Sequence, residues 1–191
     1  MDTKKLTFVI MMGALGNILF LISYLIGPIA PNVALDFSLL AILLAGIYAG
    51  PRAGFITGII AGLAPGIVLG PVGGSVIGLI AIPIGKSLTG LTIGLLAAHL
   101  KLNQKPRKSI LSIPLTLLSY IPEGIFTYVY LAAFLPVFFA GSAPPSVIVP
   151  TIMIKAIIEV IIMSFMIAAI IDNRAVNNFI TTYFNKTATK N

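Results

Sequence analysis

A stripe of glycine with a four-residue period is the feature that most constrains how this sequence folds. Glycine occupies every fourth position from residue 46 to residue 78: Gly46, Gly50, Gly54, Gly58, Gly62, Gly66, Gly70, Gly74 and Gly78. This period places the glycines along one face of a helix, where two backbones can approach closely. In water, each glycine would weaken a helix by about 1 kcal/mol relative to alanine. In lipid, an unsatisfied backbone amide is so costly that the segment stays helical and its glycines become packing surface.

The composition points to the same environment. The chain has 191 residues, of which 58% are hydrophobic and only 9% are charged. Soluble domains carry about 25% charged residues, so the composition predicts a membrane protein that crosses the bilayer several times. With no cysteine and a single histidine, His99, the chain lacks the usual residues for thiolate or histidine metal sites and for nucleophilic catalysis. We therefore expect no catalytic residue, no metal and no cofactor.

Apolar stretches and their breaks predict an all-α fold with six transmembrane helices in one compact bundle, formed by residues 1–172. The expected helices cover about residues 6–26, 34–49, 53–69, 75–100, 110–140 and 147–171. Asp36 is expected to cap the second helix, and the Pro51 turn to join it to the third. Pro65 is expected to kink or break the third helix, and three prolines to bend or break the fifth. Residues 173–191 are expected to form a polar cytoplasmic tail that frays.

The basic residues predict the orientation of this bundle. Ten of the twelve lysines and arginines fall at one set of helix ends, and the other two lie within predicted spans. The connecting segments around residues 28, 73 and 142 contain no lysine or arginine. By the positive-inside rule, both termini lie in the cytoplasm and the protein resides in the cell membrane. Basic residues arranged in this way reflect topology, so we expect no nucleic-acid partner.

Four ionisable side chains lie inside predicted spans: Lys86, Glu123, Lys155 and Glu159. Each needs a partner, a cavity or a neutral form, because charge at the bilayer centre costs at least about 2.5–3.5 kcal/mol. Lys155 and Glu159 are four residues apart on one helix and can pair, whereas Lys86 and Glu123 would meet across the bundle. Two interpretations remain open, namely two structural ion pairs, or a polar ligand cavity between the fourth, fifth and sixth helices. Lys155 lies at the better depth for a ligand from outside, and it would suit an anionic ligand group.

Three further side chains are candidates for ligand contact. Tyr120 and Tyr128 lie close to Glu123 in the sequence, and aromatic rings with a polar tip suit a small organic ring better than a bare ion. Asn17, in the first predicted helix, can either touch a ligand or form a hydrogen bond between helices.

Three segments of the chain resemble a known family. Residues 35–40 (LDFSLL), 44–54 (LAGIYAGPRAG) and 58–63 (GIIAGL) are similar to the second and third helices of the S components of energy-coupling factor (ECF) vitamin transporters. In that family, an acidic residue opens the second helix, a Gly-Pro turn follows, and glycines line the third helix. The chain length, the six spans and the cytoplasmic termini also match the family layout.

The resemblance implies a function without catalysis. An S component binds a vitamin or a related small molecule near its outer face and docks on a transmembrane coupling subunit that carries two ATPase subunits. The ligand is released inward from that complex. The family docks through small residues on its first helix, and the corresponding residues here are Gly13, Ala14 and Gly16, without the strict family pattern.

Two other classes of function remain open at this point. One is a stand-alone small transporter that couples transport to protons through Glu123 or Glu159, although no inverted repeat is visible. The other is an intramembrane enzyme, which would have only carboxylates and lysines for its chemistry.

Overall fold

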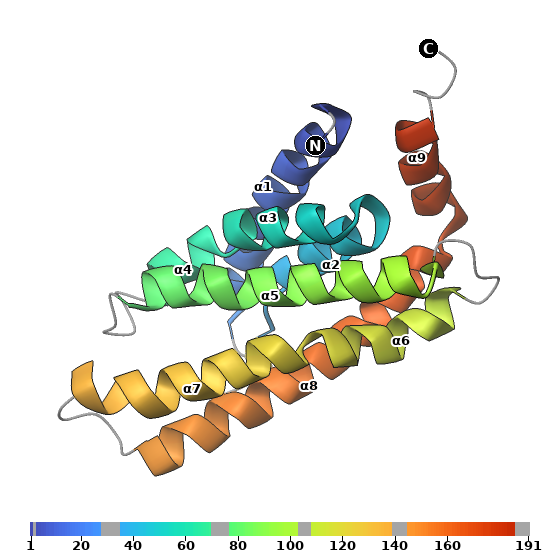
Figure 1. Ribbon diagram of the computed structural model, residues 1–191. Helices are drawn as coiled ribbons and strands as arrows, with labels where there is room; N and C mark the ends of the chain where they lie inside the picture. The colour runs from blue at the N-terminus through green and yellow to red at the C-terminus, as the bar shows by residue number, and fades with distance from the viewer. Residues whose placement is uncertain (2, 28–34, 70–76, 103–107, 139–144, 186–191) are drawn as a thin grey trace.

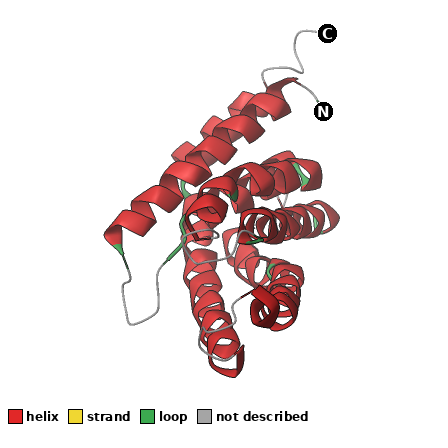
Figure 2. Cartoon of the chain, turned by 90° about the vertical axis from the view of Figure 1, so that its left-hand side faces the viewer, coloured by secondary structure: helices red, strands yellow, loops and turns green. Residues whose placement is uncertain are grey.

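The structure, a computed structural model, describes residues 1, 3–27, 35–69, 77–102, 108–138 and 145–185. Within these ranges the chain forms helices and no strand, as Figure 2 shows, and the predicted all-α class is confirmed. The helices are α1 (Thr3–Ile26), α2 (Ser38–Ala49), α3 (Pro51–Ala61), α4 (Leu63–Leu69), α5 (Gly78–His99), α6 (Lys108–Ser119), α7 (Ile121–Phe138), α8 (Pro145–Asp172) and α9 (Arg174–Asn185). Figure 1 shows their arrangement.

Five helical stretches of the described chain are long and apolar enough to cross a membrane. They are Thr3–Ile26, Pro51–Leu69, Gly78–His99, Lys108–Phe134 and Val149–Asp172. The remaining expected span, residues 34–49, corresponds to α2, which has 12 residues and is almost entirely buried. At 1.5 Å per residue it is about 18 Å long, shorter than a hydrocarbon core of about 30 Å. The lengths and composition are those of a helical membrane protein with five long helices around a short central one.

The turn between α2 and α3 is a single residue, Gly50. Its φ of 95° lies in the left-handed region that favours glycine, and its amide donates to the carbonyl of Gly46 over 3.1 Å. Pro51 then occupies the first position of α3, where a missing amide hydrogen does no harm. The predicted tight turn at Pro51 is confirmed.

The glycine stripe forms the interface on which α2, α3 and α5 pack. A Cβ atom on Gly58 would lie 2.5 Å from the Cα atom of Ser87, and one on Gly54 would collide with the backbone of Gly90. Gly90 and Gly94 of α5 face α3 in the same way, so both helices present glycine at their closest approach. The predicted role of the stripe as packing surface is confirmed for Gly46, Gly54, Gly58, Gly62 and Gly66, whereas Gly50 forms the turn and a Cβ there would meet no atom within 4 Å. Gly70 and Gly74 lie outside the described residues.

The proline breaks fall close to their expected positions. The third expected span divides into α3 and α4 at Gly62, because Pro65 has no amide hydrogen to donate to the carbonyl of Ala61. The fifth expected span divides into α6 and α7 at Tyr120, and Pro122 is the second residue of α7. Residue 34 of the second expected helix, residues 75–76 of the fourth and residues 139–140 of the fifth lie outside the described residues.

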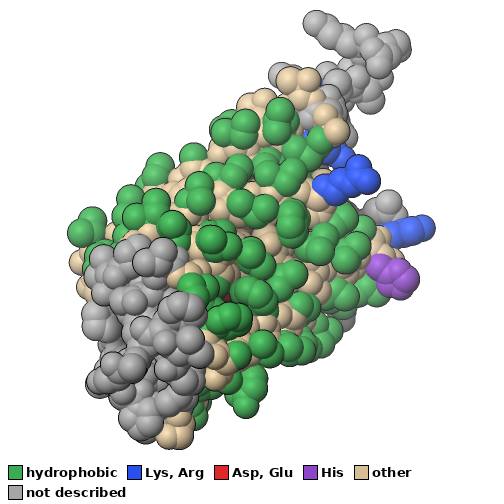
Figure 3. Space-filling view, turned by 60° about the vertical axis from the view of Figure 1, so that its left-hand side comes forward, with side chains coloured by type: hydrophobic (Ala, Val, Ile, Leu, Met, Phe, Trp, Pro, Cys, Tyr) green, Lys and Arg blue, Asp and Glu red, His purple; other side chains and the backbone are tan. Residues whose placement is uncertain are grey.

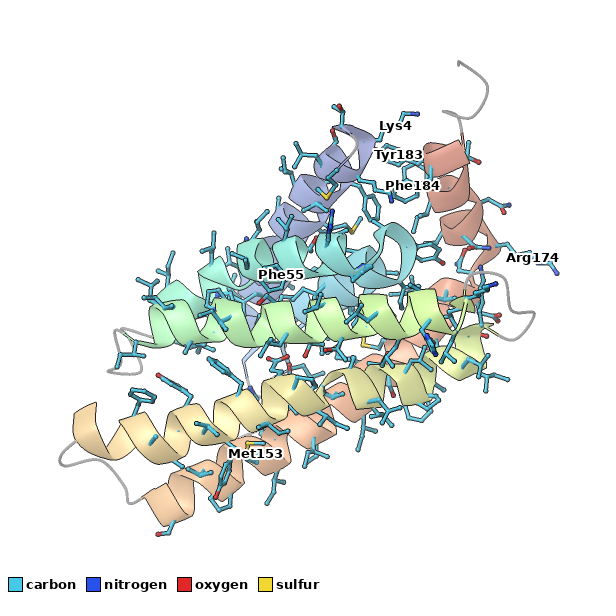
Figure 4. All side chains as sticks on the ribbon, in the orientation of Figure 1. Lys4, Phe55, Met153, Arg174, Tyr183 and Phe184 are labelled. Atoms are coloured by element: carbon cyan, nitrogen blue, oxygen red, sulfur yellow. The ribbon has the colours of Figure 1, made fainter. Side chains whose placement is uncertain are left out.

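The C-terminal segment corrects the expectation of a fraying tail. The Asn173 side chain accepts hydrogen bonds from the amides of Ala175 and Val176, over 2.9 and 3.3 Å, and so caps the start of α9. Aromatic residues of α9 then pack on α1, where the ring centroid of Phe184 lies 5.2 Å from that of Phe8 (Figure 4). This contact with the opposite end of the chain stabilises a helix that local polarity does not predict. Residues 186–191 lie outside the described residues.

The two ends of the bundle differ in charge. Basic side chains gather at one end, while hydrophobic side chains cover most of the face in view (Figure 3). The start of α1 and the helix α9 lie toward that basic end (Figure 1), and the Tyr183 hydroxyl donates to the Lys4 carbonyl over 3.2 Å. Four of the basic residues, Lys105, Arg107, Lys186 and Lys190, and the connecting segments around residues 28, 73 and 142 lie outside the described residues.

Candidate binding cavity

A cavity of about 530 Å³ lies between the α1–α5 group of helices and the α7–α8 pair. Its walls come from the second half of α1, the start of α2, α4, the first half of α5, most of α7 and the first half of α8. These segments are the ends of the helices remote from the basic end of the bundle. The volume falls in the range of sites for small organic molecules, about 300–1,000 Å³.

One wall of the cavity carries an ion pair between α5 and the start of α2. Lys86 Nζ lies 2.6 Å from Asp36 Oδ2 and donates a further hydrogen bond to the Ser38 hydroxyl over 2.9 Å. Asp36 Oδ1 accepts from the Ser38 amide over 2.9 Å. Asp36 therefore lies next to the N-cap position of α2, which Phe37 occupies. Both charged side chains are largely buried, at 9% and 13% exposed. Lys86 therefore pairs with Asp36, and the expected Lys86–Glu123 pair is corrected.

The second ion pair of the cavity lies on α8. Lys155 Nζ lies 3.5 Å from Glu159 Oε2, so the predicted pairing of these two residues along one helix is confirmed. Glu159 Oε1 also accepts a hydrogen bond from the Asp36 amide over 3.1 Å. This bond links α8 to the start of α2 and joins the two ion pairs into one polar wall.

Glu123 is the third carboxylate in the cavity, and neither of these two ion pairs includes it. One of its oxygens accepts a hydrogen bond from the Thr89 hydroxyl on α5. No ion pair involves Glu123 within the part of the chain that the structure describes. A Cβ atom built on Gly85 would lie 3.5 Å from Glu123 Cγ and 3.6 Å from a ring carbon of Phe126. Glu123 and Phe126 therefore lie beside Gly85, and all three residues line the cavity.

Aromatic side chains supply much of the remaining lining. Phe126 and Tyr130 come from α7, Tyr120 lies at the break between α6 and α7, and Phe20 and Tyr24 come from α1. The rings of Phe20 and Tyr24 stack, with their centroids 6.0 Å apart. Charged groups and aromatic faces together provide partners for a small organic molecule.

Tyr128 lies outside this arrangement, which corrects its prediction as a ligand contact. Its side chain is 55% exposed, and it does not line the cavity. A helix turns by about 100° per residue, so Tyr128 is directed away from the face of α7 that carries Glu123, Phe126 and Tyr130.

Asn17 also lies outside the cavity lining, and it bridges the break between α3 and α4. Its Nδ2 donates to the carbonyl of Ile60 and its Oδ1 accepts from the amide of Ala64, both over 2.8 Å. These are the acceptor and donor that an unbroken helix would join directly. Of the two roles expected for Asn17, the structure places it in the hydrogen bond between helices.

The three candidate docking residues on α1 do not share a face. A Cβ atom on Gly13 would collide with the Ile60 side chain at 2.5 Å, and one on Gly16 would meet Ala61 Cβ at the same distance. Both glycines therefore pack α1 against α3. Ala14 is exposed and remains on the outer surface of the bundle.

The main residue that the sequence analysis missed is Asp36, which was assigned a capping role alone. The signal was Lys86, a buried lysine that has no acidic residue one turn away on its own helix and so requires a carboxylate from another element. Phe20, Tyr24 and Gly85 were also missed, because nothing in their local sequence distinguishes a cavity face from a lipid face.

Comparisons with protein families, curated proteins and solved structures were all negative. No family model, no curated protein and no solved structure matches this chain.

Proposed function

We propose that this chain is the substrate-capture subunit of an ATP-driven importer of the ECF type, and that it binds a vitamin or a related small micronutrient. The resemblance of residues 35–63 to S components suggests this class. The cavity between α1–α5 and α7–α8 supports it independently, because it has the size and the mixed aromatic and charged lining of a small-molecule site.

The observation that carries the proposal is the position of the cavity relative to the basic end of the bundle. The cavity is built from helix ends remote from the basic residues, and the positive-inside rule assigns those basic residues to the cytoplasm. A cavity in the outer half of the membrane suits a subunit that captures its ligand from outside. Release to the inside then requires partners, for which we propose a transmembrane coupling subunit and two ATPase subunits.

Docking on such a coupling subunit would use the outer face of α1. Ile10, Ala14 and Ile18 recur at four-residue spacing on α1 and are all exposed. Gly13 and Gly16 pack against α3 and are not accessible to a partner. We propose that Ala14 is the small residue at which a helix of the partner packs closely on α1.

Native mass spectrometry of the protein purified alone in a non-ionic detergent tests the capture role. We expect a small molecule bound at one per chain, identified after extraction. Gly85→Leu fills the space beside Glu123 and Phe126, and the bound molecule should be lost. Ala98→Leu adds the same side chain at an exposed position of the same helix, and the bound molecule should remain.

A stand-alone proton-coupled transporter is the alternative, and Glu123 is the observation that favours it. A cavity carboxylate outside both ion pairs is the kind of group that can carry a proton across a membrane. The discriminating experiment is uptake into proteoliposomes that contain this chain and no ATPase. Solute uptake driven by a pH gradient and lost in Glu123→Gln would overturn the capture proposal.

A further inference from the structure

The ionisable side chains of the cavity do not balance. Among the described residues, three carboxylates line it, those of Asp36, Glu123 and Glu159, but only two ammonium groups, those of Lys86 and Lys155. Lys86 is paired with Asp36, and Lys155 is paired with Glu159. The formal sum is one negative charge, and Glu123 is the carboxylate left over.

The rest of the sequence does not restore the balance. Segments 28–34, 70–76 and 139–144 contain no aspartate, glutamate, lysine or arginine. The other lysines and arginines of the described chain fall at the basic end of the bundle (Figure 3), and none of them lines the cavity. Lys105, Arg107, Lys186 and Lys190 lie outside the described residues. Three of the five acidic side chains of the whole chain are thus concentrated in the cavity, at the end where basic residues are fewest.

This arrangement bears on the charge of the ligand. A group that brought a second negative charge would meet three carboxylates and two lysines that already have partners, whereas a positive group would complete the pairing. An uncompensated carboxylate in a low-dielectric site is costly, so a cation placed there gains both a charge-assisted hydrogen bond and relief of that cost.

The position of Glu123 also bears on the shape of the ligand. Its carboxylate and the ring of Phe126 flank the same space beside Gly85, where no Cβ intrudes. The phenol-bearing rings of Tyr120, just before the start of α7, and Tyr130, within α7, line the same cavity. A planar ring would lie against these aromatic side chains while its positive group reaches the carboxylate, and the electron-rich ring faces favour a cation as well.

We propose that the ligand is a small planar organic cation, and that Glu123 binds its positively charged group. The inference rests on the proposed capture function and specifies its substrate class. In this proposal, Lys86 holds the Asp36 carboxylate in place and Lys155 holds that of Glu159. Lys155 then has a different role from the one expected from the sequence, where it would meet an anionic group of the ligand.

Three probes of nearly equal shape test the charge preference: benzamidine (a cation at neutral pH), benzamide (neutral) and benzoate (an anion). Their dissociation constants would be measured with the full chain in non-ionic detergent, by ligand-observed saturation-transfer NMR, after removal of any co-purified molecule. We expect benzamidine to bind about ten- to one-hundredfold more tightly than benzamide, the range of a charge-assisted hydrogen bond, and benzoate to bind most weakly.

Two variants separate Glu123 from the general charge of the cavity. In Glu123→Gln the preference for benzamidine over benzamide should fall to about threefold or less, within the scatter of a neutral hydrogen bond. In Lys155→Gln the cavity becomes more negative, so the preference for benzamidine should persist or grow. If benzamidine binds to the wild-type protein but not to Gly85→Leu, the probe binds in the cavity.

Two other results would contradict the proposal that Glu123 binds a cationic ligand. Equal binding of benzamidine and benzamide would mean that Glu123 holds a proton and carries no charge toward the ligand. A preference for benzoate that disappears in Lys155→Gln would mean that the lysine is the anchor. Either outcome is compatible with the proposed capture function. The capture function itself is contradicted if the purified protein holds no small molecule and transports solute without an ATPase.

Discussion

The Lys86–Asp36 ion pair illustrates how individual residues hold this bundle together. Replacing Lys86 with Met removes the ammonium group that lies 2.6 Å from Asp36 and leaves a buried carboxylate without its partner. We expect the free energy of unfolding to fall by about 3–5 kcal/mol, the usual loss when one member of a buried pair is removed. A denaturant titration in detergent micelles, followed by circular dichroism, measures this change.

The matched control is the double variant Lys86→Met with Asp36→Asn. Asparagine retains an oxygen that can accept from the Ser38 amide, so the cap of α2 is preserved while both charges are removed. The double variant should be more stable than Lys86→Met alone. Strictly additive losses from the two single substitutions would contradict a direct pairing between them.

Asn17 gives a second prediction at this scale, because its two proposed roles have different consequences. Asn17→Leu removes the bridge between the Ile60 carbonyl and the Ala64 amide, and should lower the free energy of unfolding by about 1–3 kcal/mol. The affinity for a cavity ligand should be unchanged in the protein that remains folded. A large loss of ligand affinity with unaltered stability would instead support direct contact of Asn17 with the ligand.

At the scale of residues, the sequence identifies charged groups more reliably than it identifies their partners. Four of the five ionisable groups in the cavity could be predicted, because a charge within an apolar span is conspicuous. The Lys155–Glu159 pair could be predicted too, since both members lie on one helix. The Lys86–Asp36 pair depends on how the start of α2 packs on α5, and Tyr128 was misassigned because neighbouring helical positions face in different directions.

At the scale of helices, the interface between α3 and α5 depends on glycine. Gly58→Ala would place a Cβ atom 2.5 Å from the Cα atom of Ser87, so the backbones of α3 and α5 must move apart. We expect a loss of about 1–3 kcal/mol in the free energy of unfolding, typical of overpacking. A denaturant titration in micelles provides the measurement.

The control is a glycine-to-alanine substitution at Gly85, a buried glycine of α5 that does not pack against α3. Gly85→Ala places its Cβ atom 3.5 Å from the nearest neighbour, an ordinary contact, because Gly85 faces the cavity. Its stability should be equal to that of wild type or higher by up to about 1 kcal/mol, the difference in helix propensity. Similar losses for Gly58→Ala and Gly85→Ala would mean that glycine matters for backbone flexibility and not for close approach.

Apolar length and proline positions predict most of the helices, but they miss features that depend on packing between distant segments. α2 is a short buried helix because neighbouring helices surround it, a property that hydropathy alone does not reveal. α9 depends on contacts of Tyr183 and Phe184 with Phe8, from the opposite end of the chain. The glycine stripe predicted close packing, whereas the glycines of α5 that complete the interface became evident only in three dimensions.

At the scale of the whole molecule, the orientation in the membrane determines from which side a ligand reaches the cavity. The natural chain contains no cysteine, so a single introduced cysteine reports its own position without background. Thr3, at the start of α1, lies at the basic end, and Ser146, near the start of α8, lies at the other end. Both residues are exposed, and neither substitution alters the distribution of basic residues that governs orientation.

A membrane-impermeant maleimide should label Ser146→Cys in intact cells that express the protein, and should label Thr3→Cys only after the membrane is permeabilised. This pattern places the termini in the cytoplasm and the cavity in the outer half of the bilayer, as capture from outside requires. The reverse pattern would orient the cavity toward the cytoplasm. In that orientation the same carboxylate and aromatic side chains would meet a solute from inside the cell, and an import role would no longer fit the molecule.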